Sequence, residues 1–88
     1  FKTFDEVIQR ANDNDLGLCS YLYTNSMDKA HIGSEKLETG CVAVNTGVVA
    51  LAEAPFGGIK QTGYGREGGS GAIKDYLNVK YTHMGLKI

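Results

Sequence analysis

Apolar side chains recur at helical spacing near the start of the chain, at positions i, i+3, i+4 and i+7, which are occupied by Phe4, Val7, Ile8 and Ala11. Thr3 precedes this stripe and Glu6 follows Thr3 by three positions, so the two residues can cap the first turn reciprocally. The Asn and Asp residues at 12–15 then compete with helical hydrogen bonds. The pattern predicts a helix that begins after Thr3 and stops near Asn12.

The next segments alternate between strand and helix patterns. Residues 18–23 are rich in aromatic side chains and follow Gly17, as in a mostly buried strand. Helical spacing then returns, and Gly40 is placed to close this helix in the left-handed conformation, which predicts a helix over about 26–39. Residues 41–45 read as a second buried strand. The succession predicts a right-handed βαβ crossover with parallel strands, and therefore an α/β fold.

This predicted sheet needs more elements than the chain supplies. A parallel sheet is covered on both faces, and one crossover helix with one extra helix cannot provide that cover. We therefore expect the two strands to belong to a larger sheet. The chain also opens at Phe1 rather than Met, so we expect further residues upstream.

Periodicity is lost between residues 46 and 63, a stretch that contains the only proline of the chain. A loop of this length inside a domain is usually functional or disordered, and its apolar side chains favour packing or ligand contact. A short helical pattern returns at 70–77. Residues 79–82 alternate enough to predict a final strand.

Composition narrows the classes of partner. The 88 residues are 42% apolar and 22% charged, with a formal net charge of -1 and no basic run. This excludes the electrostatic footprint of a nucleic-acid or anionic-membrane binder. The longest uncharged stretch, 41–52, is far shorter than the roughly 18 apolar residues of a spanning helix, so we expect no membrane anchor.

Residues capable of nucleophilic or metal chemistry are few. We interpret Cys19 and Cys41 as reduced core residues, because their apolar strand settings offer no base or positive charge that would activate a thiol. His31 and His83 lack metal-ligand spacing. The sequence therefore predicts no metal site and no catalytic residue.

The glycine-rich run at 63–71 has two possible interpretations. Converging amides could cradle a phosphate, but the run lacks both the GK[ST] ending and the G-x-G-x-x-G pattern, so unusual backbone angles are the favoured explanation. Within it, Arg66 and Glu67 are interpreted as structural anchors rather than chemical groups. Lys60 remains a weak candidate for binding an anionic group.

Residues 54–68, APFGGIKQTGYGREG, closely resemble the PFGG-x-K-x-S/T-G-x-G-R-E signature near the C-terminus of aldehyde dehydrogenases. Flanking pieces agree in order and spacing over essentially the whole chain: Ala11-Asn12, Leu16-Gly17-Leu18, Tyr23-Thr24, Leu37-Glu38-Thr39-Gly40, Val44-Asn45, Asp75-Tyr76-Leu77 and Lys80-Tyr81. Residues 45–49 and 80–86 look most like those of succinate-semialdehyde dehydrogenases.

The resemblance implies a fold and a reaction. It implies the C-terminal part of the aldehyde dehydrogenase fold, in which 1–76 end the catalytic domain, with its parallel sheet, crossover helix and substrate-tunnel loop 46–63, and 77–88 form an oligomerisation strand and tail. The family oxidises aldehydes to acids with NAD or NADP. Its nucleophilic cysteine, general-base glutamate and Rossmann-like domain lie upstream, so the resemblance implies no catalytic, cofactor-binding or metal residue here, and no activity or bound cofactor for the fragment alone.

Two residues carry over to the substrate tunnel. Phe56 matches the aromatic wall, and Ala50 falls at a substrate-contacting position where succinate-semialdehyde enzymes usually have serine. The implied partners are the remainder of the enzyme and further copies of it, as a dimer or tetramer joined through the C-terminal strand, where Asn78 replaces a common acidic residue. We expect a cytoplasmic location, or a mitochondrial one in a eukaryote. An independent non-catalytic assembly module, or a remnant, is the alternative.

Overall fold

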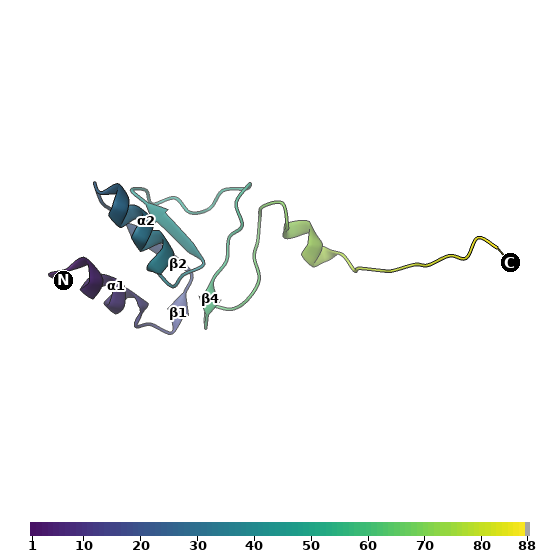
Figure 1. Cartoon of the computed structure of the whole chain (residues 1–88), viewed down its shortest axis with the longest axis horizontal. Coiled ribbons are helices and arrows are strands. Elements are labelled where there is room, and N and C mark those ends of the chain that lie inside the picture. Colours follow the sequence, from purple (N-terminus) through teal and green to yellow (C-terminus); the bar gives the residue numbers. More distant parts are fainter. Residues whose placement is uncertain (88) are drawn as a thin grey trace.

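The computed structural model describes residues 1–87, so Ile88, the last residue of the predicted tail, lies outside the described part of the chain. Its first half is an α/β unit in which two helices pack beside a two-stranded parallel sheet (Figure 1). The unit is formed by α1 (Phe4–Asn12), β2 (Cys19–Leu22), α2 (Met27–Lys36) and β3 (Cys41–Val44).

The predicted first helix is confirmed, with one difference in its cap. The Thr3 hydroxyl accepts a hydrogen bond from the Glu6 amide at 3.1 Å, as the capping box predicts. The Glu6 carboxylate, however, accepts from the amide of Lys2 at 2.8 Å rather than from that of Thr3. Both hydrogen bonds satisfy backbone N–H groups at the N-terminal end of α1, where the helix has no carbonyl acceptors of its own to offer.

The predicted parallel pairing is also confirmed, because β2 and β3 pair in register from Cys19 opposite Cys41 to Leu22 opposite Val44. Both strands are shorter than predicted, and they are mostly half-buried rather than buried, with only Ala43 buried among their described residues. The helix between them ends earlier than predicted, at Lys36, and Gly40 is not left-handed. The side chain of Asn12 explains the earlier end, since it accepts from the Glu38 amide at 2.8 Å and donates to the Lys36 carbonyl at 2.7 Å.

A second small sheet was missed by the sequence patterns. Strand β1 (Leu16–Gly17) pairs antiparallel with β4 (Ile59–Lys60), which lies inside the segment predicted as the loop 46–63. Two-residue strands show no alternation that a sequence pattern could reveal. The pairing joins the end of the loop to the segment that connects α1 to β2.

The C-terminal part extends away from this body (Figure 1). A 3-10 helix, η1 (Ala72–Tyr76), occupies the predicted helical segment. The strand predicted at 79–82 is absent from the single chain, because these residues pair with no strand among residues 1–87. The molecule measures 75 × 24 × 19 Å as a result.

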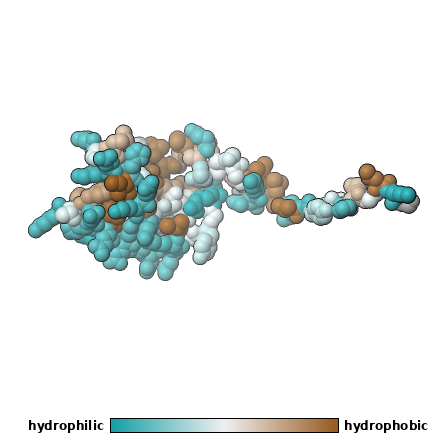
Figure 2. All heavy atoms as spheres, in the orientation of Figure 1, coloured by the Kyte–Doolittle hydropathy of each residue, from teal (hydrophilic) through white to brown (hydrophobic). Residues whose placement is uncertain are grey.

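Within residues 1–87, Ile8 and Ala43 are the only buried hydrophobic side chains, and neither is completely shielded from solvent. Large apolar residues instead lie on the surface of the body and along the tail (Figure 2). This agrees with a sheet that needs cover from elsewhere. Within residues 1–87, no helix has the length and apolar character needed to cross a bilayer.

Candidate functional site

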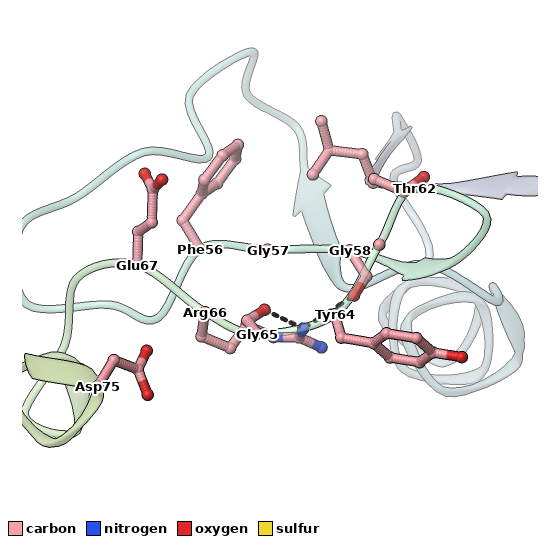
Figure 3. A pocket seen from close by; sticks show the side chains of 11 residues that line it. Phe56, Gly57, Gly58, Thr62, Tyr64, Gly65, Arg66, Glu67 and Asp75 are labelled. Atoms are coloured by element: carbon pink, nitrogen blue, oxygen red, sulfur yellow. Dashed lines mark hydrogen bonds between the residues drawn. The ribbon is translucent and has the colours of Figure 1, made fainter. Parts of the chain in front are cut away.

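The signature segment folds back on itself and forms the walls of the candidate site. The amide of Phe56 donates to the carbonyl of Glu67, and the amide of Glu67 donates to the carbonyl of Phe56, both at 2.7 Å. The two side chains project to the same side of this bridge (Figure 3). The bridge therefore fixes the backbone beneath the Phe56 ring.

Arg66 ties the two halves of the signature together. Its Nη1 donates to the carbonyl oxygens of Gly58 at 2.8 Å and Gly65 at 2.7 Å (Figure 3). A side chain at Gly57 would meet the Arg66 Cδ atom at 2.8 Å, so this glycine leaves room for the arginine. The interpretation of Arg66 as a structural anchor is confirmed.

Lys60 is anchored as well, rather than free to bind an anion. Its ammonium group donates to the carbonyls of Asn12 at 3.0 Å and Asn14 at 3.1 Å, and lies 2.8 Å from the Glu38 carboxylate. These three partners occupy the three donors of a lysine. The backbone of Lys60 has a φ of 58°, a left-handed conformation that costs an ordinary residue about 1–2 kcal/mol. The anion-binding interpretation of Lys60 is not supported.

The glycine-rich run adopts the backbone angles that its composition favours. Gly63, Gly65, Gly68 and Gly69 all have positive φ values, between 68° and 112°. The run passes beside the loop, where the amide of Gly69 donates to the Ala52 carbonyl at 3.0 Å. The explanation by unusual backbone angles is therefore confirmed for these four glycines.

Ala50 and Phe56, the two predicted substrate contacts, line one hollow of about 290 Å³ together with Glu67. Ala50 is exposed and Phe56 is half-buried. The other lining residues come from the loop and from Gly68. The structure thus brings Ala50 and Phe56, which are six positions apart in the sequence, to the same hollow.

A second hollow, of about 340 Å³, lies beside the Phe56–Glu67 bridge (Figure 3). Both Arg66 and Asp75 line it, and Asp75 comes from η1. Asp75 was not predicted as a site residue from the sequence. No local motif could have indicated it, because its place depends on how η1 follows the glycine run.

The two cysteines lie opposite each other on β2 and β3. Both are free, but both are half-buried, so the prediction that they are core residues is wrong. Burial raises the pKa of the Cys19 thiol, and the neighbouring Cys41 raises it further. The Cys41 Sγ donates to the Gly57 carbonyl at 3.6 Å. A raised pKa lowers the fraction of Cys19 that is present as the reactive thiolate at neutral pH.

The two histidines form no shared site. The Nδ1 atom of His83 lies 3.1 Å from the Tyr81 hydroxyl in the tail, whereas His31 is exposed on α2. Among residues 1–87, no three His, Cys, Asp or Glu side chains are grouped so that they could hold a metal ion.

The sequence profile of the aldehyde dehydrogenase family matches residues 1–82. Succinate semialdehyde dehydrogenase of Acinetobacter baylyi is 48% identical over 85 residues, which are 97% of this chain and 18% of the relative. 3-Sulfolactaldehyde dehydrogenase of Pseudomonas putida is 47% identical over 85 residues, with the same two shares.

A solved structure, the NAD+ complex of an aldehyde dehydrogenase from Bacillus cereus, superposes with a TM-score of 0.89 at 40% identity. The match covers 99% of this chain and 18% of that one. The chain therefore belongs to the aldehyde dehydrogenase family, a family of oxidoreductases, and its similarity to succinate-semialdehyde dehydrogenases is confirmed. It spans about 18% of the length of these relatives.

Proposed function

We propose that this chain is the C-terminal part of an NAD(P)-dependent aldehyde dehydrogenase, in which it supplies substrate-tunnel wall and subunit contacts. The whole protein would oxidise an aldehyde to a carboxylic acid and reduce one NAD or NADP for each aldehyde consumed. The rest of the protein would supply the nucleophile, the general base and the cofactor domain. The 88 residues alone would be inactive. The family match supports this proposal.

The shared hollow of Ala50 and Phe56 is the observation that carries the tunnel-wall role. The reciprocal 2.7 Å hydrogen bonds between Phe56 and Glu67 hold the backbone under the ring. Arg66 braces the same segment through the carbonyls of Gly58 and Gly65. A wall built in this way presents its aromatic ring in a fixed position, which a substrate-positioning group requires.

We infer that the substrate is an aldehyde with a second, acidic group. Two relatives of the chain, succinate semialdehyde dehydrogenase and 3-sulfolactaldehyde dehydrogenase, are named for such aldehydes. Ala50 presents a methyl group to the hollow, and a methyl group cannot donate a hydrogen bond to a carboxylate. Succinate semialdehyde would therefore bind less tightly than in enzymes that have serine at this place.

The decisive experiment uses the whole natural protein that contains these residues. Reduction of NAD or NADP is followed by absorbance with succinate semialdehyde and with an uncharged aldehyde of similar length. Phe56→Ala should raise KM about tenfold, because roughly 1.4 kcal/mol of apolar contact is lost, while Phe56→Leu should retain most of the affinity. A wild-type protein that reduces neither cofactor with any of these aldehydes would overturn the proposal.

A homo-oligomer and a compartment are part of the same proposal. The extended residues 77–87 present exposed apolar side chains, including Leu77, Val79 and Tyr81, and backbone groups that pair with no strand within residues 1–87. Such a segment is suited to adding a strand to a sheet of another subunit. Two free cysteines are typical of a reducing compartment, which supports the cytoplasm or, in a eukaryote, the mitochondrion.

A further inference from the structure

Cys19 and Cys41 face each other across the parallel strands β2 and β3. They are direct partners in the register of the two strands, and they are the only cysteines of the chain. Partners in neighbouring strands lie about 4.8 Å apart and point their side chains to the same face. That separation falls within the range of roughly 4.4–6.8 Å that a disulfide spans between Cα atoms.

The pair lies on the side of the sheet that faces the signature segment. Both cysteines are free and half-buried in the described chain. The sheet face that carries them lies under the signature loop, because the Cys41 Sγ donates to the Gly57 carbonyl at 3.6 Å. The other face, with Leu22, packs against α2, where Leu22 lies close to Gly33. The two thiols therefore share the side of the sheet that faces the loop.

We propose that Cys19 and Cys41 form an oxidisable dithiol site, which a low-molecular-weight disulfide such as oxidised glutathione converts to a disulfide within the chain. One cysteine thiolate attacks a sulfur of the oxidant, breaks its S–S bond and releases one thiol. The thiolate of the second cysteine then attacks the mixed disulfide and releases the second thiol. Two electrons and two protons pass from the cysteines to the two released thiols, and one new S–S bond joins β2 to β3.

Oxidation would also change the contact with the loop. The Cys41 Sγ donates its proton to the Gly57 carbonyl in the reduced state, and a disulfide sulfur has no proton to donate. Gly57 lies next to Phe56 in the signature segment. The oxidation state of the pair is therefore connected, through one hydrogen bond, to the backbone that carries the Phe56 ring.

The test treats the full natural protein with oxidised glutathione under native conditions, blocks the remaining thiols with N-ethylmaleimide and maps tryptic peptides by mass spectrometry. Cleavage after Arg10, Lys29, Lys36 and Lys60 places the cysteines in separate peptides, 11–29 and 37–60. We expect a linked 11–29/37–60 peptide that exceeds the glutathione adducts about tenfold, because paired thiols react at a high effective concentration.

Two controls distinguish a cysteine pair that the fold holds together from chance oxidation. In denaturant the linked peptide should fall about tenfold relative to the adducts, because the strands no longer hold the sulfurs together. Cys41→Ser should leave only the glutathione adduct of Cys19, and Cys19→Ser only that of Cys41. Native protein that yields adducts without the linked peptide, or links the peptides equally well when denatured, would overturn the proposal, whereas the proposed dehydrogenase activity is assayed separately in fully reduced protein.

Discussion

Gly40 is a residue at which the backbone of the α/β unit passes close to the signature segment 54–68. A Cβ atom there would collide with the Gly57 carbonyl oxygen and meet the Gly58 Cα atom at 2.8 Å. We predict that Gly40→Ala lowers the free energy of unfolding by about 1–3 kcal/mol, as for overpacked sites, because backbone must move. Gly47→Ala is the matched control, since its Cβ would meet nothing within 4 Å, and it should change stability by less than about 0.5 kcal/mol. Equal effects of the two substitutions in urea titrations of the whole protein would contradict this account.

Ionisation of Cys19 is a second property that belongs to single residues. Burial raises its pKa first, the neighbouring Cys41 adds to the increase, and a hydrogen bond with Tyr21 acts in the opposite direction. Only the thiolate reacts with iodoacetamide, so the labelling rate should rise with pH through a midpoint above that of an ordinary cysteine. Cys41→Ala removes one cause of the shift and should move the midpoint of Cys19 labelling to lower pH. Labelling that follows the profile of a free thiol would exclude the shift.

Gly40 and Lys60 also show what residue-level reasoning could not resolve. A glycine after a helical pattern serves equally well as a left-handed cap or as a place where backbone passes closely, and only the position of Gly57 decides between them. Lys60 likewise looks available as an isolated loop lysine. Its partners, Asn12, Asn14 and Glu38, lie 22 or more positions away, so no local pattern reveals that its charge is engaged.

At the scale of elements, Asn12 acts as the clamp between the ends of the two helices. Its side chain accepts from the Glu38 amide and donates to the Lys36 carbonyl, which lie just past and at the end of α2. We predict that Asn12→Ala destabilises the fold by about 1–2 kcal/mol, because two hydrogen bonds to backbone groups are lost. Asn25→Ala, at an exposed turn position, should have an effect below about 0.5 kcal/mol. Thermal unfolding followed by circular dichroism compares the two, and similar losses would argue against the clamp.

The elements that the sequence predicted are those whose hydrophobic spacing is local. The stripe of α1 and the apolar runs of β2 and β3 repeat with the period of their own structure, so each could be recognised alone. The β1–β4 pair could not, because it depends on tertiary contacts such as the 2.8 Å bond from the Gly17 amide to the Thr62 hydroxyl. The candidate site likewise combines a feature that the sequence indicates with one that depends on tertiary contacts. The resemblance pointed to Ala50 and Phe56, but the hollow that they share is a property of the folded loop.

At the scale of the molecule, the surface is too large for a self-sufficient fold. Its accessible area is 7448 Å², whereas a folded monomer of 9.5 kDa exposes roughly 5000 Å². Its radius of gyration is 19.0 Å, against roughly 12 Å for a compact domain of this length. The excess comes from the tail and from apolar faces such as Leu16 and Tyr21. The need for further cover could be predicted from the sequence, because a lone parallel crossover cannot cover its own sheet.

The tail offers the last prediction, which tests subunit contact through residues 77–87. In a strand, the N–H groups of successive residues point to opposite edges, so either Lys80 or Tyr81 would donate to the neighbouring sheet. One of the two proline variants, Lys80→Pro or Tyr81→Pro, should therefore raise the subunit dissociation constant about tenfold or more, while the other has a smaller effect. Lys80→Ala and Tyr81→Ala are the matched controls, because each removes the same side chain but keeps the backbone donor.

Light scattering after size exclusion of the whole protein measures the association, and unfolding measurements show whether the body is unchanged. The tail makes no strand pairing within residues 1–87, so the variants should leave the unfolding of the α/β unit unaltered. Loss of association in one proline variant, with a stable body, supports a strand added to a partner's sheet. If both proline variants associate as tightly as their alanine controls, backbone pairing through this segment is excluded. The apolar side chains of the tail would then be the remaining means by which it contacts another subunit.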